Sequence, residues 1–272
     1  MLGRLFKYDM RSLSRFLLII HGFVILAALI CRILFTGRIE LTDASIDQNS
    51  VSLTLIFIVF FLIIMAVSFG TYIVIAVRFY KNMFSDEGYL TKTLPVTCSQ
   101  HLISKIIAGS IWAIIDGIVL LASAALVMVT PSVINIYAEH KDVIFAEFGL
   151  NRPGAMTSYI AVMVLLSLLG AVSSVIMIYC SIAFGQLFSS HRILGAVVSY
   201  FVITMLLSVL ATMLMVISGF FTIYGPGVSS ANFDFLAYIM SIYKTSLLLC
   251  VGTLIAGYIA TYYIMKKKIN LN

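Results

Sequence analysis

The sequence predicts an all-α polytopic membrane protein with six transmembrane helices and both termini in the cytoplasm. Apolar residues make up 62% of the 272 positions and charged residues only 10%, well below the roughly 25% charge of soluble domains. Long apolar runs alternate with short polar intervals, and about 20 apolar residues suffice to cross a bilayer. The intervals leave no room for a soluble domain. Residues 1–272 are therefore expected to form a single transmembrane domain, without nucleic acid as a partner.

The span boundaries follow from charges, prolines and glycines at the ends of the apolar runs. The predicted spans cover residues 16–35, 51–80, 103–130, 156–188, 193–221 and 243–265. Polar residues among apolar ones in the interval 131–155 favour a short helix outside the membrane. The four residues Ser189 to Arg192 predict a tight hairpin between the fourth and fifth spans. Residues 232–243 are apolar enough to dip back toward the membrane before the last span.

Residues 1–15 predict an N-terminal amphipathic helix at the membrane interface. Basic side chains fall largely on one side of this helix: Arg4, Lys7, Arg11 and Arg15. Apolar side chains fall near the other, so the helix can lie along anionic headgroups. The alternative interpretation is ordinary basic charge flanking the first span.

Lys and Arg near the span ends predict the orientation. Twelve lie on one side: Arg4, Lys7, Arg11, Arg15, Arg78, Lys81, Lys92, Lys105, Arg192, Lys266, Lys267 and Lys268. Four lie on the other: Arg38, Lys141, Arg152 and Lys244. The side richer in Lys and Arg is cytoplasmic. Both termini are then inside, which fits an even number of spans, because such a number places them on the same side.

No arrangement of residues typical of a membrane enzyme occurs in the sequence. The four histidines, His21, His101, His140 and His191, are scattered over different segments and suggest no metal site. A GxxxxGK[ST] phosphate-binding motif is absent, so the chain is not expected to bind nucleotide itself. The four cysteines show no pairing pattern. We therefore expect a chain that is not itself catalytic and binds no cofactor or metal.

Asp116 is the one carboxylate deep within a predicted span, about 16 Å along the helix from Lys105. A charge at such a depth is costly and suggests a transport pathway or an ion site. The alternative, slightly favoured, is a carboxylate that hydrogen-bonds to a neighbouring helix and serves packing. Arg32 is expected to reach the outer headgroups rather than to pair with Asp116.

Small residues recur in the predicted spans and favour close approach between helices. They are Gly109 and Ser110, the run from Gly170 to Ser174, and the segment from Gly252 to Gly257. The sequence leaves open whether these contacts form within one chain or between two.

The interval from Arg78 to Lys105 is the longest charged stretch between two apolar runs, and the orientation places it in the cytoplasm. Asp86 and Glu87 precede a turn at Gly88, and the segment from Thr97 to Gln100 has the pattern of a capping box. Three apolar side chains follow the first turn: Tyr89, Leu90 and Leu94. A protein partner would use them; otherwise they fold back onto headgroups or helix ends.

Two motifs then resemble one protein family. Residues 84–96, FSDEGYLTKTLPV, with Ser104 and Lys105, resemble the loop between spans 2 and 3 of ABC-2 type permeases. These are the membrane subunits of bacterial ATP-binding-cassette exporters. Residues 179–195, YCSIAFGQLFSSHRILG, resemble the turn between spans 4 and 5 of the same family. Their order and spacing across nearly the whole chain carry the resemblance.

The resemblance implies an ATP-driven exporter of the bacterial plasma membrane, with two permease subunits around a pathway and one ATPase subunit on each. ATP and Mg would be bound by the ATPase. The cytoplasmic loop at residues 81–102 would carry a coupling helix, with Phe84, Asp86, Glu87, Tyr89, Leu90 and Leu94 as the ATPase-coupling residues. The N-terminal helix would also touch the ATPase. The family carries diverse cargo; the apolar spans favour an amphipathic peptide, an antibiotic or a lipid-like molecule.

The residues also allow a function without ATP. An ion-coupled transporter built around Asp116, or a membrane sensory or assembly protein, would have the same composition. An inverted repeat would favour the transporter, and the first and last three spans show no convincing similarity.

Overall fold

The computed structural model describes residues 2–35, 48–85, 87–88, 95–188, 190–220 and 234–267. In these ranges the chain is helical and contains no strand. The prediction of an all-α protein with six helices long and apolar enough to cross a membrane is confirmed.

The helices are α1 (Leu2–Phe35), α2 (Gln48–Phe84), α4 (Cys98–Met128), α5 (Pro131–Glu147), α6 (Ala155–Gly185), α7 (Arg192–Ile217) and α9 (Phe235–Lys267). Three of them, α1, α2 and α9, extend beyond the predicted spans at one or both ends, α4 begins before its predicted span, and α6 and α7 end before theirs. The expected short helix after the third span is α5. The segment expected to dip back is residues 232–243; residues 232 and 233 lie outside the described residues, and from Phe235 on the segment instead forms the first turns of α9, since Asp234 caps that helix by accepting the Ala237 N–H. The hairpin between α6 and α7 is longer than predicted and covers residues 186–191.

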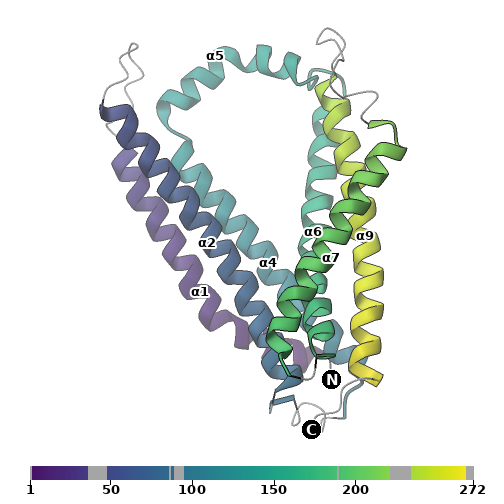
Figure 1. The fold of residues 1–272 in the computed structure, drawn as a ribbon. Coiled ribbons are helices and arrows are strands. Elements are labelled where there is room, and N and C mark those ends of the chain that lie inside the picture. Colours follow the sequence, from purple (N-terminus) through teal and green to yellow (C-terminus); the bar gives the residue numbers. More distant parts are fainter. Residues whose placement is uncertain are drawn as a thin grey trace.

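The six long helices form two groups, α1/α2/α4 and α6/α7/α9 (Figure 1). The groups meet at the end where α1 begins and α9 ends, here called the converging end. They spread apart toward the other end, the open end, and α5 crosses from one group to the other there (Figure 1). The beginning of α1 and the end of α9 lie at the same end of the molecule, as expected for six spans.

The main apolar core lies toward the converging end, where α4 and α2 pack against α6. Phe79 of α2 stacks on Tyr179 of α6, with ring centroids 3.8 Å apart and an interplanar angle of 11°. Gly109 of α4 permits this contact, because a Cβ there would lie 2.9 Å from the Tyr179 hydroxyl and 3.0 Å from Val175. Aromatic stacking and close packing therefore join the two groups at this end.

The first helix differs from the prediction of a separate interfacial helix at residues 1–15. Leu2–Phe35 is one continuous α-helix, because no proline interrupts it and its apolar face has partners along its length. Asp9 and Leu13 are buried against the rest of the protein. Arg4, Lys7, Arg11 and Arg15 are all exposed. The segment is amphipathic, but its inner side packs against protein helices.

The small residues divide into close contacts and open positions. Close approach is confirmed at Gly109 and at Gly257, where a Cβ would lie 2.5 Å from Ile176 Cγ2. Gly185 lies against the backbone of Ala196 at the start of α7. A Cβ at Gly170 or Gly252 would meet nothing within 4 Å. Those two glycines therefore do not mediate packing within the chain.

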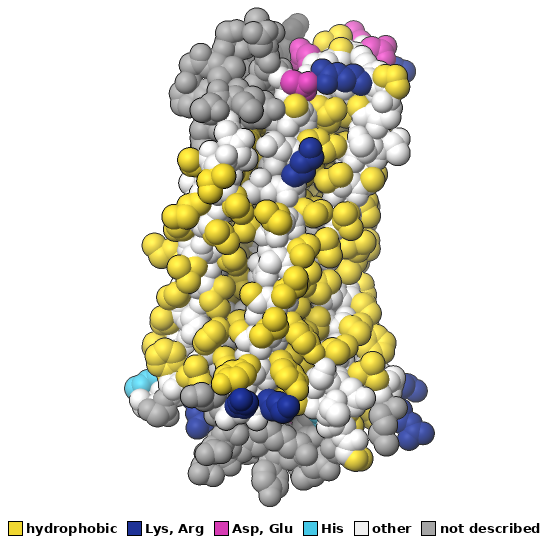
Figure 2. Space-filling model, turned by 90° about the vertical axis from the view of Figure 1, so that its right-hand side faces the viewer, with side chains coloured by type: hydrophobic (Ala, Val, Ile, Leu, Met, Phe, Trp, Pro, Cys, Tyr) yellow, Lys and Arg dark blue, Asp and Glu magenta, His cyan; other side chains and the backbone are white. Residues whose placement is uncertain are grey.

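The outer surface is apolar over most of its height. Figure 2 shows the side formed by the α6/α7/α9 group, with hydrophobic side chains between the charged ends. Acidic side chains are visible near the open end, and Lys and Arg lie at both ends (Figure 2). Along α7, Gly195 alone is buried. Such a surface suits a helix that faces lipid or another membrane helix.

Candidate functional site

A cluster of polar side chains lies inside the converging end. We call it the inner polar cluster; its members are Asp9, Arg78, Asn82, Glu87, Ser104 and Lys105. Lys105 Nζ of α4 lies 2.9 Å from Asp9 Oδ1 of α1, and Ser104 Oγ donates to Asp9 Oδ2 at 2.7 Å. The Asp9 and Lys105 side chains are only 10% and 6% exposed. A buried ion pair of this kind is held by its hydrogen bonds as well as by its charges.

Asn82 extends the cluster from α4 to the loop after α2. Its amide is oriented by the surrounding hydrogen bonds: Oδ1 accepts from Lys105 Nζ at 3.2 Å, and Nδ2 donates to Glu87 Oε2 at 2.8 Å. Arg78 lies one turn earlier on α2, with Nη1 3.8 Å from Glu87 Oε2. A continuous set of polar contacts therefore joins Glu87 in the loop to Asp9 in α1.

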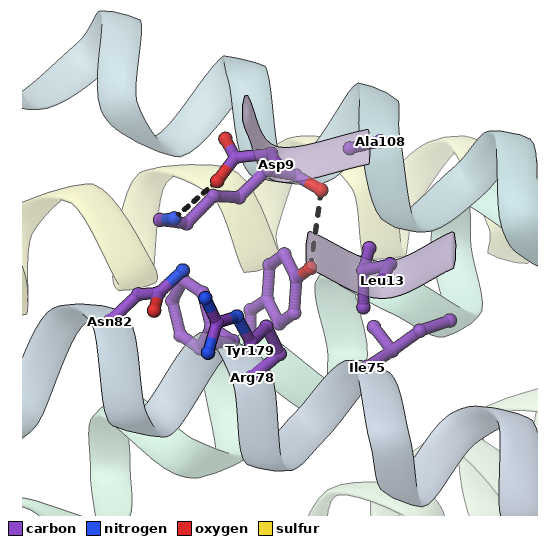
Figure 3. Close-up of a pocket in the computed structure, with 9 residues that line it drawn as sticks. Asp9, Leu13, Ile75, Arg78, Asn82, Ala108 and Tyr179 are labelled. Atoms are coloured by element: carbon purple, nitrogen blue, oxygen red, sulfur yellow. Dashed lines mark hydrogen bonds and ion pairs between the residues drawn. The ribbon is translucent and has the colours of Figure 1, made fainter. Parts of the chain in front are cut away.

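The residues of the cluster enclose little space. Figure 3 shows the Asp9, Arg78, Asn82 and Tyr179 side chains around one small cavity. Its volume is about 10 Å³, which is room for no more than one water molecule. The Tyr179 hydroxyl donates to the Lys105 backbone carbonyl at 3.1 Å. The cluster can hold helices together and transmit movement, but it cannot hold an organic ligand.

A second polar group lies deeper in the α1/α2/α4 group, on the same face of α4. We call it the midspan triad: His21 of α1, Thr71 of α2 and Asp116 of α4. His21 Nε2 lies 2.9 Å from Asp116 Oδ1, and Thr71 Oγ1 donates to the same oxygen at 2.7 Å. The three residues are 4%, 0% and 3% exposed. Asp116 thus hydrogen-bonds to two neighbouring helices.

An apolar groove of about 500 Å³ lies between α2, α6 and α7. Most of its lining is aliphatic, with hydroxyl groups at Tyr72, Tyr80, Tyr200, Ser174 and Ser181. This volume is in the range of small-molecule binding sites. Asp116 does not line the groove.

The structure describes only part of the predicted coupling segment. The capping box is confirmed: Thr97 Oγ1 accepts from Gln100 N, and Gln100 Oε1 accepts from Thr97 N. Glu87 is exposed, whereas Phe84 is buried in the core against Phe79 and Tyr80. The helix α2 continues to Phe84, so the loop is shorter than residues 81–102.

Four of the predicted coupling residues lie outside the described residues: Asp86, Tyr89, Leu90 and Leu94. Gly88 lies within them and turns the chain sharply, because a Cβ there would be 2.7 Å from the Met83 carbonyl carbon and oxygen. Only Gly fits this approach without moving backbone atoms. The turn expected after Glu87 is therefore present at Gly88.

Sequence reasoning expected Asp116 to hydrogen-bond to a neighbouring helix, which is confirmed, but it identified neither the partners of Asp116 nor the inner polar cluster, although the spacing along the helices carried a signal. Asp9, Leu13, Leu17 and His21 recur every four residues and share one face of α1, and all four are buried. On α4, Lys105, Trp112 and Asp116 recur at helical spacing and are also buried. Arg32, expected at the headgroups, donates to the Val129 carbonyl at 2.8 Å at the end of α4.

The fold and these sites define a multi-pass helical membrane protein with two buried polar groups in one half. In the described ranges no three His, Cys, Asp or Glu side chains gather as metal ligands would. Comparisons with protein-family models, curated proteins and solved structures gave no match.

Proposed function

We propose that this chain is the transmembrane subunit of an ATP-driven exporter, of the ABC-2 permease type that its loop and hairpin motifs resemble. A separate ATPase subunit would bind ATP and Mg and dock on the cytoplasmic loop after α2. A second permease subunit, the same or a related chain, would complete the pathway in the bacterial plasma membrane. The observation that carries this proposal is the set of contacts from Glu87 through Asn82 and Lys105 to Asp9.

These contacts supply a physical route for coupling. A partner that displaces the loop pulls on Glu87, which is hydrogen-bonded to Asn82 and near Arg78 on α2. Separating Lys105 from Asp9 would leave buried charges unpaired, so α1 and α4 are expected to move together. Phe84 anchors the end of α2 in the core and does not itself face a partner. Movement of the loop would therefore reach the helices that form the α1/α2/α4 group.

The exposed basic residues of α1 fit a second contact with the ATPase or with anionic headgroups. Arg4, Lys7, Arg11 and Arg15 are exposed at the converging end, while Asp9 on the opposite face holds the helix to α4. The charges are therefore presented outward by a helix that is fixed to the core. A positively charged surface at this position suits an acidic partner surface.

The groove between α2, α6 and α7 is the best place for cargo. Its aliphatic lining and hydroxyl groups suit an amphipathic molecule, such as an apolar peptide, an antibiotic or a lipid-like compound. Closing the two groups onto each other would change its width, because one wall belongs to each group.

Purification of the tagged chain from its native membrane tests the proposal. We expect an ATPase subunit to copurify. In the reconstituted complex, its rate of ATP hydrolysis should change when Glu87 is replaced in the variant Glu87→Lys. This substitution reverses the charge beside Arg78 and removes the acceptor for Asn82. Glu87→Gln keeps the shape and isolates the effect of charge. Glu147→Lys, exposed at the end of α5, is the matched control at the open end.

Two results would overturn the proposal. One is the absence of any ATPase from the purified assembly. The other is hydrolysis in the Glu87→Lys complex equal to that of the Glu147→Lys control.

A second candidate function is an ATP-independent, ion-coupled transporter that uses Asp116. The observation in its favour is the burial of this carboxylate beside His21. Transport abolished by Asp116→Asn, in a preparation without ATPase, would favour it over the exporter.

A further inference from the structure

The hydrogen bonds of His21 fix the number of protons in the midspan triad. His21 Nδ1 lies 2.7 Å from the Leu17 backbone carbonyl, which can only accept, so Nδ1 carries a hydrogen. His21 Nε2 lies 2.9 Å from Asp116 Oδ1. A neutral imidazole protonated at Nδ1 and an ionised carboxylate would place two acceptors against each other at this contact.

A second hydrogen is therefore required between Nε2 and Oδ1. Thr71 cannot provide it, because its hydroxyl hydrogen is used in its own bond to Oδ1 at 2.7 Å. The extra hydrogen resides either on Nε2, giving an imidazolium and a carboxylate, or on Oδ1, giving two neutral groups. In both cases the pair of side chains has no net charge, as a buried site in a membrane span demands.

Among the residues that the structure describes, no other charge near Asp116 could replace this proton. Within the described residues His21 is the one basic side chain within 4.0 Å of Asp116. On α4 the nearest basic residue along the helix is Lys105, about 16 Å away, and it is paired with Asp9. On α1 the basic residue nearest to His21 along the helix is Arg15, whose side chain is exposed. From α2, besides Thr71, the Tyr72 phenol lies close enough to interact with Asp116, and from α6 Ser174 lies near that phenol.

We propose that His21 and Asp116 form a reversible proton-binding site that joins α1 to α4, with the bound proton on His21 Nε2 as an imidazolium facing the Asp116 carboxylate. The ligand is a single proton, taken up from water and released to water, with no other bond made or broken. When the proton leaves, Nε2 and Oδ1 become two acceptors 2.9 Å apart, and the buried pair gains a negative charge. The contact between α1 and α4 then weakens, so the packing of the α1/α2/α4 group depends on pH. This site does not depend on an ATPase partner.

The protein contains its own reporter for this site. Its single tryptophan is Trp112, whose ring stacks on His21 with centroids 6.1 Å apart and an interplanar angle of 21°. Protonated imidazole quenches indole fluorescence more strongly than neutral imidazole does. The Trp112 emission of the full-length protein in lipid nanodiscs should therefore follow the protonation of His21.

The experiment records tryptophan emission between about pH 5 and about pH 10. We expect the wild type to show one reversible transition, brighter at high pH. His21→Gln should abolish it. Asp116→Asn should move its midpoint to lower pH by about one unit or more, because the amide donates to neutral Nε2 and no longer favours the second proton. The amide also keeps the shape of the site, and its nitrogen carries two hydrogens that can be donated to Nε2 and to the Thr71 hydroxyl oxygen, so this variant is expected to fold.

His101→Gln is the matched control. His101 is also buried on α4, but it lies eleven residues, about 16 Å, from Trp112, so its replacement should leave the transition unchanged. Emission that stays constant with pH in the wild type would overturn the proposal. A transition that persists in His21→Gln, or an unchanged midpoint in Asp116→Asn, would overturn it equally.

Discussion

The two helix groups are similar in length and hydropathy but differ in how they are held together. In the α1/α2/α4 group, polar contacts join the helices at three levels: the buried pairs Asp9 with Lys105 and His21 with Asp116, and an exposed contact of Arg32 with the end of α4. In the α6/α7/α9 group the one ion pair and the tyrosine contact between elements in the described ranges lie at the open end, between Arg152 and Asp234 and between Tyr159 and Tyr243. Deeper in this group, within the same ranges, only uncharged side chains meet, where the Cys180 and Cys250 thiols lie beside Thr261 and Ser173. There the helices depend mainly on close packing, as at Gly185 and Gly257.

This difference suggests different roles for the two groups. Buried charged contacts have narrow geometric requirements, so the α1/α2/α4 group is expected to move as one unit and to respond to charge and pH. Apolar packing between helices allows sliding at lower cost, and along α7 Gly195 is the one fully buried residue. The α6/α7/α9 group is therefore the better candidate for lateral movement against lipid, cargo or a second subunit.

The largest effect is expected from Lys105→Met, which tests the polar anchoring of the first group. The substitution leaves the buried Asp9 carboxylate without its cation, a change that costs about 3–5 kcal/mol. The thermal unfolding temperature in detergent should fall well below that of Lys81→Met, the control at an exposed position on α2. Adding Asp9→Asn to Lys105→Met should restore part of the loss. Equal unfolding temperatures for the two single variants would remove the distinction between the groups.

A smaller effect is expected from Gly185→Ala, which tests the close packing of the second group. The new Cβ would lie 2.5 Å from the Ala196 backbone nitrogen, so α6 and α7 must move apart. Overpacking of this kind costs about 1–3 kcal/mol. Gly252→Ala is the control, since it meets nothing within 4 Å and should be neutral or stabilising by up to about 1 kcal/mol. If both variants unfold at the same temperature, α6 and α7 are not in close contact.

The contact between the two groups should contribute less to the stability of the protein than the contacts within either group. Tyr179→Phe removes the hydrogen bond to the Lys105 carbonyl but keeps the ring on Phe79. The expected loss is about 0.5–1.5 kcal/mol, measured as a lower unfolding temperature than for Tyr263→Phe, whose ring is half exposed. A higher unfolding temperature for Tyr179→Phe than for the wild type would mean that the hydroxyl destabilises the contact between the two groups.

The same comparison separates what the sequence could predict from what it could not. Span positions, the capping box at Thr97 and the close approach at Gly109 depend on local composition or spacing, and the sequence predicted them. The continuity of α1 was missed because positive charge on one face was attributed to a membrane surface. The deciding contact comes from Lys105, 96 residues away along the chain.

Most contacts in the two candidate sites join residues that lie far apart in the sequence. His21 and Asp116 are 95 residues apart, and each appeared isolated in the sequence because neither has a charged residue three or four positions away on its own helix. The four-residue recurrence from Asp9 to His21 indicates a shared face but does not identify the helix opposite. Partner identity requires the packing order of the helices, which a single sequence does not provide.

The smallest effect is expected from the ion pair at the open end. Arg152 Nη1 lies 2.8 Å from Asp234 Oδ2, but the Arg152 side chain is 64% exposed, so the pair contributes less than about 1 kcal/mol. The pKa of Asp234 is lowered first by the hydrogen bond from the Ala237 backbone N–H and then by Arg152. A carboxyl group whose pKa is lowered in the folded state stabilises that state at pH values above its ordinary pKa. This stabilisation is lost as the pH falls through the lowered pKa.

Asp234→Asn should therefore reduce the unfolding temperature slightly near pH 7 and should have no effect at a pH below the lowered value. Arg152→Gln should produce only part of that reduction, because the Ala237 N–H still binds the carboxylate. Unfolding temperatures measured in detergent, from near pH 7 down to a pH below the lowered pKa, test whether Asp234→Asn loses more stability than Arg152→Gln. A loss in Asp234→Asn as large as that in Lys105→Met would contradict the comparison, because the second group would then depend on a charge as strongly as the first.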